Sequence, residues 1–237
     1  MLQWQPGTVI QIEQATHNTR RYWIELRETD SFPFRPGQFV TLDLPVHEQR
    51  SKRWRSYSIA SMPDGNVIEL IISYVAGGSG TEYIFKEVNI GSVVSLRGPQ
   101  GVFTLPEQLA GHDLYLICTG TGIAPFRSML LYMDRHRVPH GQVHLIFGCR
   151  TQQDLLYADE MTRLEQRMEQ FRYHPTLSRE TWAGHTGYVH AIYEALCRER
   201  RPSLFLLCGW RAMIDEARRR IADMGYDKKD IHLELYG

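Results

Sequence analysis

Two glycines near the middle of the chain have the spacing of a phosphate-binding turn. Thr119-Gly120-Thr121-Gly122 follows the apolar run 113–119 and precedes a helical pattern that extends to about residue 137. Glycines at a strand-to-helix turn let the backbone approach a pyrophosphate, and the helix N-terminus supplies N–H groups and a positive dipole. The turn therefore predicts a nucleotide-phosphate site, although glycine at such a turn can also serve strand–helix packing alone.

The residues around this turn favour NADP(H) over NAD(H). Pro125 replaces the third glycine of the usual dinucleotide fingerprint, and the acidic residue that would hold a ribose 2′-hydroxyl is missing. Instead, Arg150 follows the second apolar run, and Ser178-Arg179 follows the third. Guanidinium groups match phosphate geometry, so these residues predict a site for a 2′-phosphate. The alternative is that both arginines are solvated loop residues and that the nucleotide is NAD(H).

A third candidate lies in the first half, in Trp54-Arg55-Ser56-Tyr57-Ser58. Side chains alternate between the two faces of a strand, so Arg55 and Tyr57 share one face. A cation and an aromatic ring on one face suit an extended ligand with an anionic part. A core tyrosine beside a surface arginine would give the same pattern.

The first half reads as a small antiparallel barrel. Six short runs rich in β-branched and aromatic residues are separated by Gly, Pro and Asp turns, and one segment, 81–88, has a helical pattern. Such a series favours a barrel over a parallel sheet. The predicted strands are 8–14, 21–28, 38–44, 55–61, 67–75 and 92–98.

From about residue 111 the pattern changes to near-continuous apolar runs that alternate with amphipathic helices, as in a parallel sheet buried on both faces. The sequence thus predicts two domains: an N-terminal antiparallel β-barrel over 1–108 and a C-terminal α/β parallel-sheet domain over 109–237. The predicted parallel strands are 113–119, 142–148, 171–178, 203–209 and 231–236, and 211–224 is a predicted helix.

Composition excludes several classes of function. Lys+Arg and Asp+Glu both number 27, so no overall basic field attracts nucleic acid or an acidic membrane. The four cysteines are too widely spaced for a zinc or iron–sulfur site, and no metal site is expected. The chain has no signal-peptide pattern at its start and no window of apolar residues long enough to span a bilayer, so we expect a cytoplasmic protein.

Taken together, the motifs resemble those of the ferredoxin–NADP(+) reductase family, in the family's order and over nearly the whole chain. They are Arg55-Ser56-Tyr57-Ser58, Gly77-Gly78-Ser79-Gly80-Thr81, Gly98-Pro99-Gln100-Gly101-Val102-Phe103, the turn 119–126, Cys208-Gly209-Trp210-Arg211-Ala212-Met213 and Glu234-Leu235-Tyr236.

The resemblance implies a flavin site in the barrel. Arg55 would pair with the flavin phosphates, and Tyr57 would lay its ring against the isoalloxazine. Ser58 would stand near flavin N5, although strict alternation directs it away from Tyr57. The turn that contains Gly78, Ser79, Gly80 and Thr81 would hold the flavin phosphates. FAD is expected, because most of the family uses it; FMN is the alternative.

The resemblance also implies roles in the α/β domain. Tyr236 would cover the second face of the flavin, although Gly237 follows it where the plant pattern ends in tyrosine. Cys208 would lie beside the nicotinamide. Glu234 would orient Ser58 or pass protons, and Tyr188 would stack on the adenine.

The implied activity is a flavin-dependent transfer of electrons between NADPH and a one-electron carrier, ferredoxin or flavodoxin, by a monomeric enzyme. Without an iron–sulfur cysteine set in the chain, the acceptor would be another molecule. Basic residues such as Lys52 and Arg53 would meet an acidic carrier. The alternatives are an NADH-dependent reductase of an oxygenase system, a reductase of free flavins, or a non-catalytic nucleotide-binding module.

Overall fold

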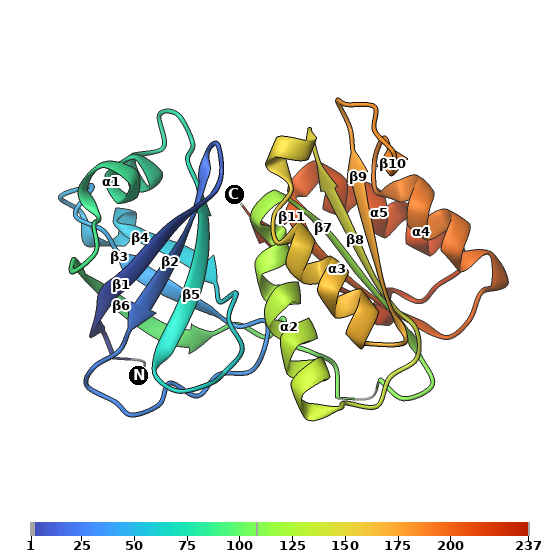
Figure 1. Ribbon diagram of the computed structural model, residues 1–237, viewed down its shortest axis with the longest axis horizontal. Coiled ribbons are helices and arrows are strands. Elements are labelled where there is room, and N and C mark those ends of the chain that lie inside the picture. The colour runs from blue at the N-terminus through green and yellow to red at the C-terminus, as the bar shows by residue number, and fades with distance from the viewer. Residues whose placement is uncertain (1–2, 108, 237) are drawn as a thin grey trace. The chain divides into compact units, whose positions relative to one another are not determined.

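The computed structural model describes residues 3–107 and 109–236. Its contacts divide the chain into two compact units, Met1–Leu105 with Ala124–Arg135, and Pro106–Ile123 with His136–Gly237. The predicted fold class is confirmed, since an antiparallel sheet comes first and a parallel sheet with helices follows (Figure 1). The predicted domain boundary after residue 108 stays a prediction, because helical residues 124–135 group with the first unit. No helix in the described ranges is long and apolar enough to cross a membrane.

The first unit contains a six-stranded antiparallel sheet in the order β4-β3-β6-β1-β2-β5. The predicted strands are all present with shifted ends, and the predicted helix begins two residues earlier, at Ser79. The elements are β1 (Gln5–Thr16), β2 (Thr19–Glu25), β3 (Phe39–Asp43), the short 3-10 turn Arg50–Lys52, β4 (Trp54–Ser58), β5 (Val67–Ser73), α1 (Ser79–Glu87) and β6 (Val93–Gln100).

Alternation along these strands builds the barrel core. Val40 and Leu42 of β3, Leu96 of β6 and Leu70 of β5 point inward and are at most 2% exposed. At the end of β4 the chain leaves β3, and Ile59 forms a bridge with Leu70 of β5. This crossing joins the two edge strands and curls the sheet towards a barrel.

The second unit contains six parallel strands in the order β10-β9-β8-β7-β11-β12 (Figure 1). All five predicted strands are present, and the two-residue β10 was not predicted. Strands and helices alternate as β7 (Asp113–Thr119), α2 (Ile123–His136), β8 (Val143–Cys149), α3 (Ala158–Arg167), β9 (Phe171–Leu177), β10 (His185–Thr186), α4 (His190–Leu196), β11 (Ser203–Trp210), α5 (Arg211–Asp223) and β12 (Ile231–Tyr236), with 3-10 turns at Gly120–Gly122, Gln152–Asp154, Cys197–Glu199 and Lys228–Asp230.

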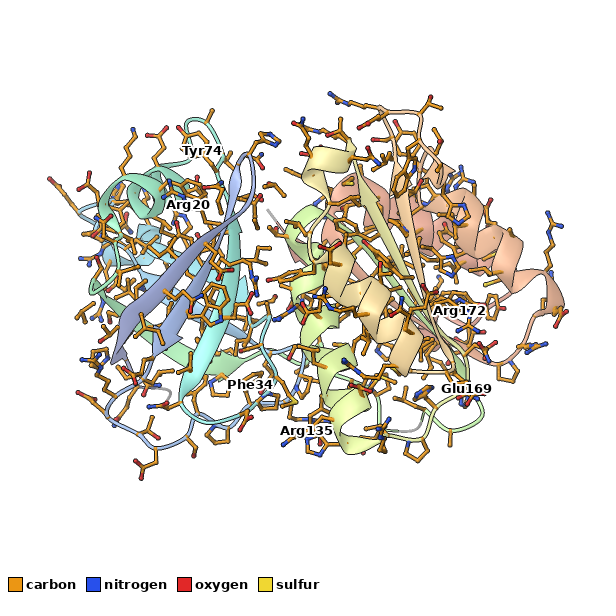
Figure 2. All side chains as sticks on the ribbon, in the orientation of Figure 1. Arg20, Phe34, Tyr74, Arg135, Glu169 and Arg172 are labelled. Carbon is orange, nitrogen blue, oxygen red and sulfur yellow. The ribbon has the colours of Figure 1, made fainter. Side chains whose placement is uncertain are left out.

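Side chains of the barrel contact helix α1 near its C-terminal end. The Arg20 guanidinium of β2 donates to the Phe85 carbonyl at 3.1 Å and lies 4.6 Å from the centre of the Phe85 ring. Tyr74, just after β5, contacts the same ring with a centroid separation of 5.5 Å, and Figure 2 shows Arg20 and Tyr74 beside the helix. A cation at the C-terminal carbonyls also complements the helix dipole. These contacts fix where the N-terminus of α1 lies.

A buried carboxylate joins β5 to α2 within the first unit. Glu69 is 2% exposed and accepts from Arg21 Nε at 2.6 Å and from Arg127 Nη1 at 2.8 Å. Arg127, itself 7% exposed, also donates to the Ala60 carbonyl at 2.8 Å. Ala60 follows β4 by two residues, so one ion-paired side chain of α2 supports the strand that contains Arg55 and Tyr57.

We predict that Glu69→Gln lowers the free energy of unfolding by about 3–5 kcal/mol, because the buried Arg127 guanidinium would lose its ion pair with the Glu69 carboxylate. Urea unfolding followed by circular dichroism measures the change. The control is Glu25→Gln on β2, which loses a pair with Arg27, 66% exposed, and should cost less than about 1 kcal/mol. Equal losses in the two variants would show that the buried network does not stabilise this unit.

Candidate functional site

Arg55 is held in place by neutral groups. Its Nη1 donates to the carbonyls of Lys52 at 3.0 Å and Trp54 at 2.9 Å, and its Nη2 donates to Ser79 Oγ at 3.1 Å. Within residues 3–107 and 109–236, no carboxylate forms an ion pair with Arg55. Its position is therefore fixed while its charge remains uncompensated, as an anion-binding arginine requires.

The N-terminus of α1 lies next to this guanidinium. The first intrahelical bond runs from Glu82 N to the Gly78 carbonyl at 2.9 Å, so the amides of residues 79–81 precede it. A Cβ on Gly80 would lie 2.7 Å from Arg55 Nε, which explains the glycine at this position. Three amides, a helix dipole and a guanidinium converge on one small region, an arrangement that suits a phosphate.

Thr81 contributes less than the sequence indicates. Its hydroxyl lies 3.2 Å from the Val75 carbonyl and 3.1 Å from the Gly78 carbonyl, and it accepts from Val75 N at 3.1 Å. The hydroxyl thus braces the loop before α1, which leaves only the backbone amide of Thr81 for a ligand.

Tyr57 and Ser58 are on opposite sides of β4, as alternation requires. Tyr57 packs partly buried against the barrel core, and burial raises the pKa of its phenol well above the usual value, so the ring stays neutral. Ser58 is 4% exposed and pairs with Phe39 at the last regular position of β4. The pairing of β4 with β3 is regular up to Ser58, so nothing in β4 turns Ser58 towards the face of Tyr57, and its predicted role near flavin N5 stays a prediction.

In the second unit, the glycine turn packs directly on β11. A Cβ on Gly122 would lie 3.1 Å from the Gly209 Cα and closer still to the Cys208 carbonyl. Gly209 has φ +140°, and a Cβ there would strike Thr119. The Thr119 hydroxyl in turn accepts from Trp210 N at 3.3 Å. The carboxyl ends of β7 and β11 and the start of α2 are thereby locked together, where ligands of open α/β sheets bind.

The predicted 2′-phosphate residues lie side by side at the next two strand ends. Ser178 N and Oγ donate to the Cys149 carbonyl at 3.0 and 3.2 Å, and Arg179 N donates to the Arg150 carbonyl at 2.9 Å. The side chains of Arg150 and Arg179 are exposed. Two guanidinium groups thus stand on adjacent backbone positions at the carboxyl edge of the sheet.

Sequence reasoning missed the residue that braces these two loops. Glu180 Oε2 accepts from Gln152 N at 2.8 Å, which ties the loop after β9 to the loop after β8. Gln152 and Glu180 are 28 residues apart. Their proximity follows from strand order, and no local signal in the sequence indicates it.

Cys208 is fully buried and pairs in register with Cys118 on one side and Glu234 on the other. Glu234 is partly exposed on β12, next to that backbone. The neighbouring thiols stay protonated at neutral pH, because burial raises the pKa of Cys149 to about 12 and that of Cys118 well above its ordinary value. None of these contacts makes a cysteine of this edge nucleophilic.

The structure describes the side chain of one of the two tyrosines predicted to stack on the ligands. Tyr188 is 74% exposed between β10 and α4, on the β9 side of the sheet. Tyr236 is the last residue of β12 and pairs with Trp210, but its side chain lies outside the part that the structure describes. Its predicted stacking role, and the effect of Gly237, stay predictions.

Two family models match the chain, one in each half. Residues 6–105 match the oxidoreductase FAD-binding domain, and residues 116–219 match the oxidoreductase NAD-binding domain. Ferredoxin–NADP reductase B of Sorangium cellulosum (strain So ce56) is 32% identical, with all of both chains covered. The chain belongs to the ferredoxin–NADP reductase family. It is therefore a flavoenzyme with FAD- and NAD(P)-binding domains, as the sequence predicts.

Reductase components of oxygenase systems are also similar. The ferredoxin–NAD(P)(+) reductase component of a naphthalene 1,2-dioxygenase system from Pseudomonas putida is 32% identical over 88% of this reductase. The match covers only 59% of that protein, so this chain spans about three fifths of its length.

Solved structures support the fold. The cytochrome P450 reductase GcoB of Amycolatopsis superposes with a TM-score of 0.89 at 28% identity, over 99% of this chain and 70% of that chain. A ferredoxin NADP+ reductase from Neisseria gonorrhoeae, solved with FAD and NADP bound, has a TM-score of 0.83 at 24% identity, over 98% of both chains. The latter likeness concerns the fold alone.

The residues of the barrel fit an FAD phosphate. We predict that Arg55→Ala weakens FAD binding by about 10- to 100-fold, the equivalent of about 1.5–3 kcal/mol for a charge-assisted hydrogen bond. Fluorescence titration of apoprotein with FAD measures the dissociation constant.

Arg53→Ala is the matched control for this test. Arg53 lies two residues away, but its Nε pairs with Asp43 at 2.8 Å, so its charge is already compensated. FAD affinity should change less than about twofold in this variant. Equal losses in Arg53→Ala and Arg55→Ala would show a general charge effect and no phosphate site at Arg55.

Proposed function

We propose that this reductase moves electrons between NADPH and a one-electron protein carrier, ferredoxin or flavodoxin, as a monomer in the cytoplasm. The main support is the full-length match to a ferredoxin–NADP reductase, in which neither chain has an unmatched domain. The four cysteines are free, which fits a reducing compartment.

The NADPH preference rests on the edge formed by β8 and β9. Arg150 and Arg179 stand on hydrogen-bonded neighbouring backbone positions, with the Ser178 hydroxyl beside them. A phosphate on the adenosine ribose would neutralise two otherwise solvated guanidinium groups. An unphosphorylated ribose would offer them no such partner.

At the flavin end, Arg55 and the amides of residues 79–81 bind the FAD phosphates, and Gly78 lets the chain enter α1 there. Tyr57 lies against one face of the ring system and excludes water from it. FAD held by these residues would supply hydride exchange with the nicotinamide and one-electron exchange with the carrier. The protein's part is to orient the rings and to control access.

At the nucleotide end, the turn from Thr119 to Gly122 binds the pyrophosphate, and Tyr188 supports the adenine. Cys208, uncharged and fully buried at the carboxyl end of β11, would lie beside the nicotinamide. Glu234 and Ser58 orient groups near the reacting atoms, with Glu234 able to hold a proton. By resemblance to the family, Tyr236 would cover the second face of the flavin until the nicotinamide displaces it.

The carrier would meet a surface whose charge is smaller than the sequence indicates. Lys52 is exposed, but Arg53 and Arg50 both pair with Asp43, at 2.8 and 3.4 Å. Because the single Asp43 carboxylate faces two guanidinium groups, this segment keeps a net positive charge, and Lys52 is its basic residue without an Asp43 contact. This arrangement favours weak, transient docking.

One specific finding favours a second function. The oxygenase reductase relatives match 86–88% of this chain with 29–32% identity, so an NADH-dependent reductase of an oxygenase system is the alternative. A reductase of free flavins would use the same two domains. The two predictions below separate these functions.

We predict that Arg179→Ala raises the Michaelis constant for NADPH by about 10- to 100-fold and that for NADH by less than about twofold, because only NADPH carries the 2′-phosphate. Steady-state kinetics with each nucleotide measure the change. The control is Arg172→Ala at the start of the same strand, labelled in Figure 2, where the guanidinium donates to the carbonyls of Glu169 and Phe171. Equal effects on NADPH and NADH would exclude a 2′-phosphate site at Arg179.

We predict that kcat/KM with ferredoxin or flavodoxin as acceptor exceeds that with free FMN by at least about tenfold, because a docked carrier receives electrons in a fixed geometry. Anaerobic assays with NADPH as the donor compare the three acceptors. Faster reduction of free FMN than of either protein would identify a free-flavin reductase instead.

A further inference from the structure

Trp210 is a large aromatic side chain left in solvent. It is 65% exposed at the carboxyl end of β11. The other tryptophans have partners: Trp4 and Trp54 pack together, Trp23 lies under Arg21, and Trp182 donates to the His185 carbonyl. Among the side chains of residues 3–107 and 109–235, the Trp210 indole has no ring, cation or hydrogen-bond partner. An exposed indole at the carboxyl end of a parallel strand, where ligands of open α/β sheets bind, is a candidate contact for a ligand.

The backbone that carries this indole is fixed. Trp210 N donates to Thr119 Oγ1 at 3.3 Å, and Trp210 is also the N-cap residue of α5. Gly209 before it packs on Thr119 too closely for any Cβ. The backbone of Trp210 is therefore fixed where the ends of β7 and β11 meet the start of α5, directly beside the glycine turn 120–122.

Strand order decides which part of the nucleotide comes near. The order is β9-β8-β7-β11, and the pyrophosphate site is the turn after β7. Arg150 and Arg179 lie on the β8 and β9 side of this turn, whereas Trp210 lies on the β11 side. A dinucleotide that places its 2′-phosphate on the arginines must extend its nicotinamide half towards β11.

We propose that the Trp210 indole contacts the nicotinamide–ribose half of the pyridine nucleotide and contributes to the affinity for that half alone. This proposal rests on the proposed function, because the arginine assignment sets the direction of the ligand. Contact with the ligand covers an apolar ring that otherwise remains in water, and stacking of an aromatic side chain on a base-like ring is worth roughly tenfold in affinity.

The test uses two ligands that do not reduce the flavin. NADP+ carries both halves, and 2′,5′-ADP carries only the adenosine half with its 2′-phosphate. Isothermal titration calorimetry of the oxidised, FAD-loaded protein gives both dissociation constants for wild type, Trp210→Ala, Trp210→Phe and Tyr188→Ala. Thermal unfolding of each variant serves as the folding control.

Trp210→Ala should weaken NADP+ binding by roughly tenfold and change 2′,5′-ADP binding by less than about twofold. Trp210→Phe should retain most of the NADP+ affinity, since it keeps a ring. Tyr188→Ala, the matched exposed aromatic on the other side of β7, should weaken both ligands by the same factor. Unchanged NADP+ affinity in Trp210→Ala, or an equal loss for both ligands, would overturn the proposal.

Failure of the proposed nucleotide preference would be visible separately. If wild type binds 2′,5′-ADP no better than 5′-ADP, the 2′-phosphate assignment fails. The Trp210 comparison is then made with NAD+ and 5′-ADP. Selective loss of NAD+ affinity would still support the indole contact, and no selective loss would exclude it.

Discussion

The nucleotide-binding edge depends on the close packing of two glycines. Gly122 lies against the Cys208 carbonyl and Gly209 lies against Thr119, with no room for a Cβ at either glycine. These two contacts bring the end of β7, the end of β11 and the start of α2 to one place. Because parallel strands end at the same edge, the arginines after β8 and β9 follow from the same arrangement. The positions of the candidate nucleotide-binding residues in the second unit thus follow from the tight packing of these two strand ends.

The two units contain the same local arrangement, which suits a phosphate. In each, a glycine-containing turn leads into a helix N-terminus, where backbone amides and the helix dipole favour an anion. In the first unit the helix is anchored at its other end by Arg20, and Arg55 adds a fixed charge. In the second, α2 continues from the turn into residues that pack with the first unit, where Arg127 pairs with buried Glu69. Each helix therefore has its own anchor, at the C-terminal end of α1 and about one turn into α2.

Local patterns predicted much of this from the sequence. Strand alternation, apolar runs and turn glycines located eleven of the strands and α1, and the motifs indicated the family. Interactions between distant residues were not predictable. The Glu69–Arg127 pair joins positions 58 apart. Thr81 looked like a phosphate ligand, yet its hydroxyl braces a loop, and Arg53 looked like a docking residue, yet Asp43 compensates it. In each case the sequence showed the polar or charged side chain but not the residue with which it forms a hydrogen bond or an ion pair.

The most direct measurement is anaerobic stopped-flow reduction of the FAD-loaded protein with NADPH and, separately, with NADH, followed by bleaching of the visible flavin band. We expect fast bleaching by NADPH and much slower bleaching by NADH, since only NADPH engages Arg150 and Arg179. Faster bleaching by NADH would contradict the NADPH assignment and favour an oxygenase-system reductase. No bleaching by either nucleotide would contradict the proposed hydride transfer itself.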